Sequence, residues 1–373
     1  METRHLVDGL RQFDRIDELR ASGFFQRHRV ELDALLGTPQ CGGSPQSSGP
    51  APDVLRLVQW NIEKGLRFQG IAEQLVTHPD LVQADVIFLN EVDVGMARTA
   101  NRHVARDLAE WLGFTWVFAP AHLELTKGVG AELEAPGDNA EALQGNAILS
   151  RYAMRDVRVV PLTNCFEPFE FEEKRYGRRV AVVAALDTVA GPLFLAGTHL
   201  EVRNTPACRA RQIRDVVDAL PPAGPALVAG DLNSGTFPRG TFARTLVGTL
   251  RLLGDVDKLK AELRNPVSRE PLFLELARGG FRIEGWNTDD VTIVEAIDSL
   301  EDAERLPKPV ARYVLKRIDR LDRKLPMRLD WFAGRDISSS HPLTISGLAD
   351  DDGRRVSDHD PIAVTVHIYG SGH

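Results

Sequence analysis

The chain has few cysteines and no long apolar run. Only Cys41, Cys165 and Cys208 occur in 373 residues, and none of them forms a Cys-x-x-Cys pair. The odd count disfavours a disulfide framework or a cysteine-based zinc site, and it favours a reducing compartment. The longest apolar runs, such as Val180–Leu186, are much shorter than the roughly 20 residues that span a bilayer.

A recognisable targeting signal is also missing. Residues 1–20 carry charges every few positions and contain no apolar core of signal-peptide length. Together with the cysteine pattern, this predicts a cytoplasmic protein that has no stable membrane anchor. Nothing in the sequence predicts a protein partner.

An excess of positive charge is absent as well. The formal net charge is -8 at pH 7, whereas a protein that coats nucleic acid needs a large cationic surface. A local basic groove stays possible, because net charge does not describe how charge is distributed. The apolar content of 43% and the charged content of 26% are typical of a globular protein.

The composition divides the chain into three parts. Residues 1–36 have apolar residues at helical spacing and predict a helical extension. Residues 37–52 are rich in Gly, Pro and Ser and predict a linker, since such a segment buries little apolar surface. Residues 53–370 are expected to form the main domain, and no fixed-period repeat is present.

Short apolar runs alternate with helical patterns throughout the main domain. The strand-like runs are residues 55–62, 85–92, 147–150, 180–186, 192–199 and 226–232. This mixture predicts an α/β sandwich. A Leu- and charge-rich stretch at about 238–326 predicts a helical insertion. The insertion either lies near the mouth of the site and shapes substrate choice, or decorates the surface.

Polar residues cluster where the predicted strands end, which is where α/β folds usually bind ligands. The blocks are WNIE (60–63), NEVD (90–93), GNAILSR (145–151), THLE (198–201), GDLN (230–233), RLDW (328–331) and SDHDP (357–361). Taken singly, His199 is also typical of a core histidine, Asn233 of a turn and Asp358 of a capped bend. Together, carboxylates, amides and histidines suit a site for a hard cation and a phosphate.

In order and approximate spacing, these blocks resemble the endonuclease/exonuclease/phosphatase superfamily, whose members have the DNase-I-like fold. The resemblance extends from about Leu55 to Ile368. It implies a four-layer α/β sandwich, two packed β-sheets flanked by helices, with the site at one end. It also implies a magnesium-dependent phosphoester hydrolase, a phosphodiesterase, nuclease or phosphatase, with Mn²⁺ as an alternative ion. Water would attack phosphorus in line, and the substrate would be nucleic acid or a small phosphodiester or phosphomonoester.

The resemblance implies residue roles as well. The metal ligands would be Glu63, Glu91 and Asp358. The catalytic residues would be His199, Asp231, Asn233, Asp330 and His359. The substrate-binding residues would be Asn61, Asn146 and Arg178. Asp330 would pair with His359 and favour its charged form. Arg178 lies in the basic stretch 174–179, which is also typical of a solvated hairpin. A catalytically inactive binding module with the same fold is the alternative function, although Glu91, Asp231 and His359 are all present.

Overall fold

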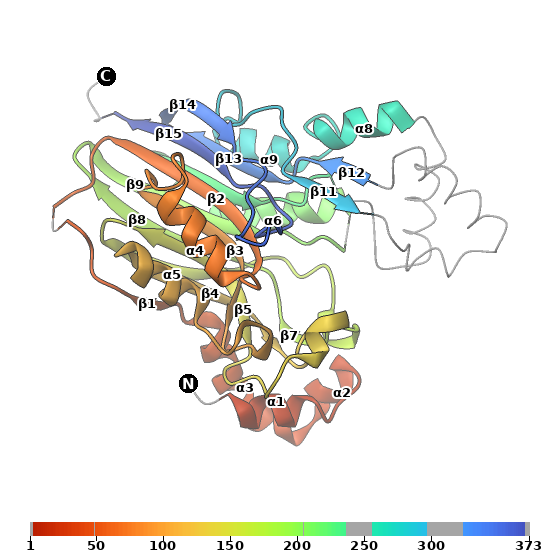
Figure 1. Cartoon of the computed structure of the whole chain (residues 1–373). Helices are drawn as coiled ribbons and strands as arrows, with labels where there is room; N and C mark the ends of the chain where they lie inside the picture. Colours follow the sequence, from red (N-terminus) through yellow and green to blue (C-terminus); the bar gives the residue numbers. More distant parts are fainter. Residues whose placement is uncertain (1–2, 48, 204, 236–255, 297–323, 370–373) are drawn as a thin grey trace.

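The computed structural model describes residues 3–47, 49–203, 205–235, 256–296 and 324–369. Within these residues, two β-sheets pack face to face and helices cover both outer faces (Figure 1). The predicted four-layer α/β sandwich is therefore confirmed.

The larger sheet contains most of the strands that begin and end the main domain. Its order is β1 (Gln40–Gly42), β4 (Thr115–Glu124), β5 (Leu143–Ser150), β3 (Val86–Val94), β2 (Val54–Lys64), β15 (Ile362–Ile368) and β14 (Ile337–Thr344), with β7 (Arg175–Gly177) also paired to β4. The pair β2–β3 is parallel, and the other pairs of this sheet are antiparallel.

The second sheet carries the middle of the chain. Its order is β13 (Asp330–Arg335), β10 (Ala226–Asp231), β9 (Gly191–His199), β8 (Val180–Thr188) and β6 (Met154–Pro161). Strands β9 and β10 run parallel. Apolar side chains from the inner faces of both sheets form one buried cluster, in which the rings of Phe88 and Phe332 lie 6.5 Å apart. This core fixes how the strand ends of the two sheets meet.

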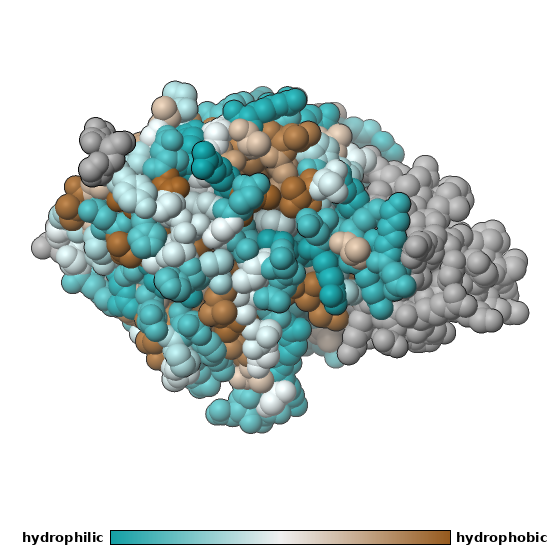
Figure 2. Space-filling view, turned by 90° about the horizontal axis from the view of Figure 1, so that it is seen from above, coloured by the Kyte–Doolittle hydropathy of each residue, from teal (hydrophilic) through white to brown (hydrophobic). Residues whose placement is uncertain are grey.

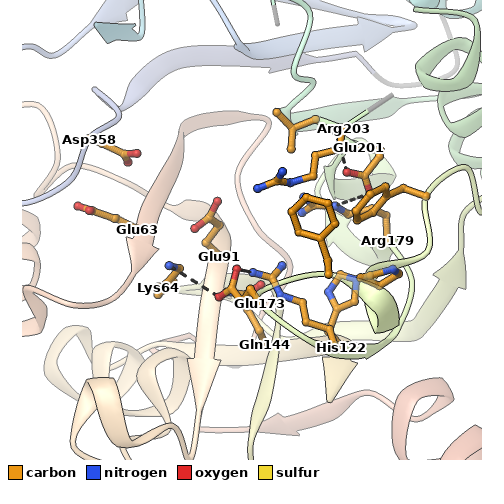
Figure 3. Close-up of a pocket in the computed structure, with 15 residues that line it drawn as sticks. Glu63, Lys64, Glu91, His122, Gln144, Glu173, Arg179, Glu201, Arg203 and Asp358 are labelled. Carbon is orange, nitrogen blue, oxygen red and sulfur yellow. Dashed lines mark hydrogen bonds and ion pairs between the residues drawn. The ribbon is translucent and has the colours of Figure 1, made fainter. Parts of the chain in front are cut away.

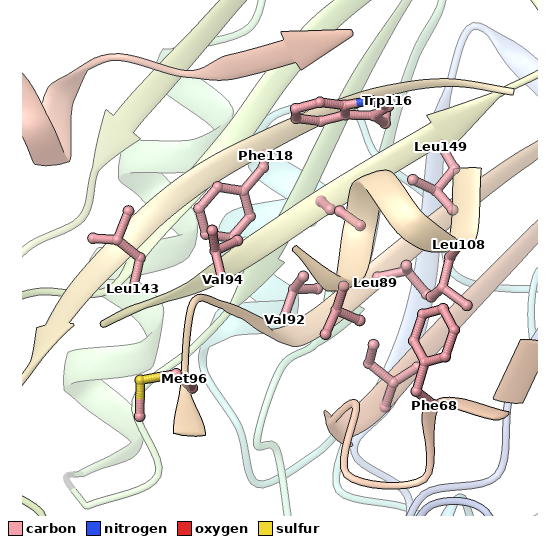
Figure 4. Close-up of a cluster of buried hydrophobic side chains, with 14 of the residues drawn as sticks. Phe68, Leu89, Val92, Val94, Met96, Leu108, Trp116, Phe118, Leu143 and Leu149 are labelled. Atoms are coloured by element: carbon pink, nitrogen blue, oxygen red, sulfur yellow. The ribbon is translucent and has the colours of Figure 1, made fainter. Parts of the chain in front are cut away.

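Helices pack on the outer faces through narrow apolar stripes. On the larger sheet lie α4 (Phe68–Thr77) and α5 (Val104–Leu112), and on the second sheet α6 (Pro206–Asp218) and α9 (Leu272–Arg278). In α5, Val104 and Leu108 are buried one turn apart. Figure 4 shows Leu108 and Phe68 beside Leu89 of the sheet. Among the residues that the structure describes, short 3-10 helices lie in connections: η1 (Ala97–Thr99), η2 (Gly130–Glu134) and η3 (Pro168–Glu170).

The N-terminal helices belong to the main body rather than to a separate extension. They are α1 (Arg4–Leu10), α2 (Ile16–Ala21) and α3 (Gly23–Gly37). Leu10, Leu19 and Leu32 are fully buried in the cluster that covers the larger sheet. Within the expected linker, β1 pairs with β4 and Ala51 is completely buried. Backbone pairing thus ties part of the predicted linker at 37–52 to the sheet despite its Gly-rich composition.

The insertion is only partly helical where it is described. It contains α8 (Val256–Arg264), α9 and a two-stranded antiparallel sheet of β11 (Ile293–Ala296) and β12 (Lys324–Met327). The rest of the prediction, at 238–255 and 297–323, lies outside the described residues. The residues before β11 contact the strand ends of the main domain, since the Asp360 amide donates to the Thr292 carbonyl at 2.7 Å.

The cysteine prediction is contradicted. A disulfide joins Cys165, in the loop before η3, to Cys208 in α6, and Cys41 is a free, exposed cysteine. These cysteines are 43 residues apart in sequence, so spacing gave no signal of their proximity. The cysteine argument for a reducing compartment loses its basis.

The surface is mixed rather than broadly apolar. On the face seen in Figure 2, hydrophilic residues predominate and apolar ones gather in small groups. None of the helices formed by the described residues has the length and apolar character needed to cross a membrane.

Candidate active site

The strand register places the predicted catalytic residues next to one another. Asp231 ends β10 and lies opposite His199 of β9 on one side and Asp330 of β13 on the other. On the facing sheet, Asn61 of β2 lies opposite Asn90 of β3. Because the sheets are packed together, the two groups meet at one end of the sandwich. The Asn61 amide nitrogen lies 3.1 Å from an Asp231 carboxylate oxygen.

Local irregularities of the backbone aim several of these side chains. The pairing of β2 with β3 shifts register between Asn61 and Lys64, and that of β3 with β5 shifts between Leu89 and Val92. Glu63 and Glu91 lie in these bulges with φ angles of 46° and 54°. A left-handed conformation is costly for residues of this kind. Bulges near functional sites commonly redirect side chains in this way.

Asp231 is the centre of the hydrogen-bond network. Its Oδ2 lies 3.4 Å from His199 Nε2 and 3.8 Å from His359 Nε2, and its Oδ1 accepts the Asn233 amide at 2.9 Å. The carboxylate is buried, which raises its pKa to about 7, with the His359 charge opposing the increase and Asp330 adding to it. A carboxyl that titrates near neutral pH is well suited to exchange a proton with water.

The two histidines of the site are held in opposite charge states. Burial alone would lower the pKa of His359, but Asp330 and Asp358 outweigh it and raise this pKa well above the ordinary value. His359 Nδ1 donates to Asp330 Oδ2 at 2.8 Å. The pKa of His199 lies well below the ordinary value because of burial and the charge of Arg179. The site therefore offers one cationic and one neutral imidazole around one carboxylate.

Three further side chains hold the loops of the site. The Ser357 hydroxyl donates to the Asn61 carbonyl at 2.7 Å and accepts the His359 amide at 3.2 Å. The Trp60 indole donates to the His359 carbonyl at 3.0 Å. Thr292 Oγ1 accepts the Asp330 amide at 3.3 Å. Trp60 and Ser357 lie within recognised sequence blocks, whereas Thr292 lies in the insertion and had no sequence signal.

The predicted metal ligands face a pocket beside this network. Glu63, Glu91 and Asp358 line it, and Figure 3 shows them on the same side. Partial burial raises the pKa of Glu63 to about 7, with repulsion from Asp358 and Glu91 adding to the effect. Such concentrated negative charge among oxygen donors fits a hard divalent cation. The three are less tightly grouped than Asp231, Asp330 and His359, whose ligand atoms lie within 4.8 Å. That leaves room for the waters Mg²⁺ retains.

Glu91 differs from Glu63 in its charge state. Burial would raise the pKa of Glu91, but Lys64 and Arg179 outweigh it and lower this pKa. The Asn61 amide nitrogen also lies 3.5 Å from Glu91 Oε1. Asn61 thus lies between Glu91 and Asp231. Glu91 is held ionised, the state that a ligand of a cation requires.

None of the three predicted substrate-binding residues is among the residues that line the pocket. Asn61 lies in the Asp231 network beside it. Asn146 is buried behind the site, where its Oδ1 accepts from Asn90 and its Nδ2 donates to the Val180 carbonyl, both at 2.9 Å. It therefore positions Asn90, whose Oδ1 accepts the Asp231 amide at 2.8 Å. Arg178 is exposed outside the pocket.

Two arginines close to Arg178 in the sequence do lie at the pocket. Arg175 and Arg179 line the pocket, because residues two and four apart share a face in extended chain while the intervening ones point away.

The Asn233 side chain donates to the Leu200 carbonyl at 2.8 Å. With its own amide on Asp231, Asn233 therefore positions that carboxylate.

Comparisons with known proteins give one family match and several similar structures. The model of the Endonuclease/Exonuclease/phosphatase family matches residues 58–359. The structures that resemble the chain include an endonuclease/exonuclease/phosphatase from Beutenbergia cavernae (17% identity, TM-score 0.48, covering 85% of this chain and 72% of that one). Another is D. rerio TDP2 complexed with single-strand DNA product (15% identity, TM-score 0.46, covering 84% of this chain and 98% of that one). A third is the human Nocturnin catalytic domain with bound sulfate (16% identity, TM-score 0.45, covering 88% of this chain and 96% of that one). No curated protein matches the sequence.

Proposed function

The chain belongs to the endonuclease/exonuclease/phosphatase family, and we propose that it is a magnesium-dependent hydrolase that cleaves a phosphoester by in-line attack of water. Family membership supports phosphoester hydrolysis in general. The observation that carries the proposal is the arrangement of Asp231 between neutral His199 and cationic His359, directly beside the carboxylates that suit a divalent cation. Perturbed pKa values cluster at functional sites, and here a buried carboxylate and two buried histidines of opposite charge state meet beside a pocket.

Glu91 would be the principal ligand of the ion, with Glu63 and Asp358 completing the carboxylate set and Mn²⁺ as the alternative to Mg²⁺. The chemistry that the bound ion supplies is stabilisation of the negative charge that develops on phosphoryl and leaving-group oxygens.

The side chains of the site divide the remaining work. Cationic His359, oriented by Asp330, donates from Nε2 to a phosphate oxygen and stabilises the charge of the transition state. Ionised Asp231 orients the attacking water and accepts its proton, for which a pKa of about 7 is suitable. Asn61 and Asn233 hold this carboxylate in place. Neutral His199 can hydrogen-bond a phosphate oxygen or the leaving group.

The substrate of this reaction is nucleic acid or a smaller phosphoester. A test is hydrolysis of a panel comprising single- and double-stranded DNA, RNA, phospholipids and inositol phosphates, with Mg²⁺ and with EDTA. We expect turnover of at least one class that requires the metal and is lost in His359→Ala. If no substrate is hydrolysed while phosphoesters still bind, the protein is the alternative, an inactive binding module with this fold.

A further inference from the structure

The pocket extends past the metal carboxylates to a floor made by two neighbouring strands. His122 of β4 and Gln144 of β5 are paired across the sheet, and both line the pocket. Each is only 4% exposed. His122 Nδ1 and Gln144 Nε2 nevertheless make no hydrogen bond to any described residue. Buried polar atoms are normally paired, so two neighbouring unpaired ones on residues that line a pocket point to a bound group.

Two guanidinium groups form the side of the same space. Arg175 and Arg179 line the pocket, and their side chains are 14% and 12% exposed. Arg175 Nε lies 3.1 Å from Glu124 and Arg179 Nε lies 3.5 Å from Glu201. These carboxylates hold the arginines from one side. We call His122, Gln144, Arg175 and Arg179 the inner subsite; Figure 3 shows His122, Gln144 and Arg179 beyond Glu91.

The inner subsite offers hydrogen-bond donors on side chains whose charges are paired. Burial and the charges of Arg175 and Arg179 hold the pKa of His122 well below its ordinary value, so this ring is neutral. Besides the three predicted metal ligands, two acidic residues line the pocket. Glu173 contacts Arg175 as well as Arg98, and Glu201 pairs with Arg179. Their charge is therefore compensated. What faces the space is a set of donors, the guanidinium groups and the Gln144 amide, with His122 able to donate from Nδ1.

The opposite wall is aromatic and fixed in place. Phe166 and Phe171 pack edge to face at 5.2 Å, and the Arg203 guanidinium lies 4.0 Å above the Phe171 ring. The Cys165–Cys208 disulfide ties this loop to α6. The whole pocket, predicted metal ligands included, has a volume of about 300 Å³, at the lower end of the roughly 300–1,000 Å³ of small-molecule sites. A preformed pocket of this size suits a small ligand group.

We propose that the inner subsite binds a second phosphate group of the substrate, joined by a short spacer to the phosphate that is hydrolysed. This rests on the proposed function, which places the reacting phosphate near Glu91 and His359. Guanidinium groups bind phosphate through parallel charge-assisted hydrogen bonds. The Gln144 amide and neutral His122 add donors without adding charge. The inner subsite thereby selects substrates that carry two phosphates.

Binding of two probes that differ only in the second phosphate tests the proposal. The probes are propanediol bisphosphate and propanediol monophosphate, titrated by calorimetry into the full chain with Ca²⁺ in place of Mg²⁺. We expect the bisphosphate to bind about tenfold tighter or more, as charge-assisted hydrogen bonds to one group provide. Arg179→Gln and Gln144→Leu should each remove most of this preference. Arg178→Gln is the matched control, because Arg178 is exposed outside the pocket, and it should keep the preference.

The outcomes separate this proposal from the proposed function. Equal affinity for both probes, tighter binding of the monophosphate, or a preference that survives both pocket variants would overturn the inner subsite. Gln144→Leu, which removes no charge, decides the matter if Arg179→Gln does not fold by circular dichroism. Hydrolysis of the substrate panel is measured separately. Hydrolysis without a bisphosphate preference refutes only the subsite, and a preference without any hydrolysis refutes only the proposed function.

Discussion

Changing Asp330 to Asn removes one charge from the site and little else. Asp330 Oδ2 accepts His359 Nδ1 at 2.8 Å, and both side chains are buried, at 0% and 5% exposure. Asn has nearly the same shape but cannot stabilise an imidazolium. Burial lowers the pKa of His359, and the charge of Asp330 is the leading contribution that raises it. The pKa of His359 should therefore fall in Asp330→Asn.

The expected magnitude follows from the burial of the pair. Removing one partner of a buried ion pair typically costs about 3–5 kcal/mol of stability. Loss of one preorganised donor to the transition state typically costs on the order of a hundredfold to a thousandfold in rate. We therefore expect kcat of Asp330→Asn to fall by about a hundredfold or more near neutral pH, and its melting temperature to fall as well.

The pH dependence has a definite sign. The folded pKa of His359 is raised above its unfolded value, so the stabilising effect of the pair is complete below about pH 6.5 and is lost as pH rises through the folded pKa. The stability difference between wild type and Asp330→Asn should thus be largest at low pH. In the profile of kcat/KM against pH, the ionisation of Asp231 near pH 7 should set the acid limb. The alkaline limb, set by His359, should move to lower pH in the variant.

The assay is kcat/KM as a function of pH for Asp330→Asn, His359→Ala and the double variant, with thermal melts of each. Asp351→Asn, at an exposed turn position, is the matched control and should behave as wild type. The two single losses should be far from additive, because both residues act as one unit. Losses that multiply in the double variant, together with an unmoved alkaline limb in Asp330→Asn, would refute the reasoning.

Three further changes test other parts of the structure. Mg²⁺ should raise the melting temperature of wild type, by the equivalent of about 2.7 kcal/mol at a hundred times Kd, but not that of Glu91→Gln; an equal shift in both would exclude Glu91 as a ligand. Removing residues 1–52 should prevent cooperative folding, since Leu10 and Leu32 are fully buried; a truncated chain with an unchanged melt by circular dichroism would contradict this. Thiol titration of the native chain should find only Cys41. Reduction of the disulfide should cost roughly 4 kcal/mol of stability, as closure of a loop of 43 residues predicts. Three reactive thiols before reduction would exclude the disulfide.

The fold class and many of the residues that meet at the candidate site could be predicted from the sequence. Alternating apolar runs and helical patterns are local signals, and they are sufficient to predict the sandwich because each element must bury its own apolar face. Polar residues such as Glu91, Asp231 and His359 follow these runs directly, so their shared location at the strand ends could be predicted from position alone. The structure brings Asp330 and His359 together as the resemblance implied.

Tertiary structure alone decided which neighbours of those residues take part. The choice of Arg179 over Arg178 depends on which face of a short extended segment meets the pocket, and the role of Asn146 depends on Asn90 lying in front of it. Thr292 contacts Asp330 from the insertion, and Cys165 meets Cys208 across 43 residues of chain. Long-range contacts of this kind leave no local pattern in a single sequence, because the apolar and polar periodicities report which face a residue occupies, and not which segment will cover it.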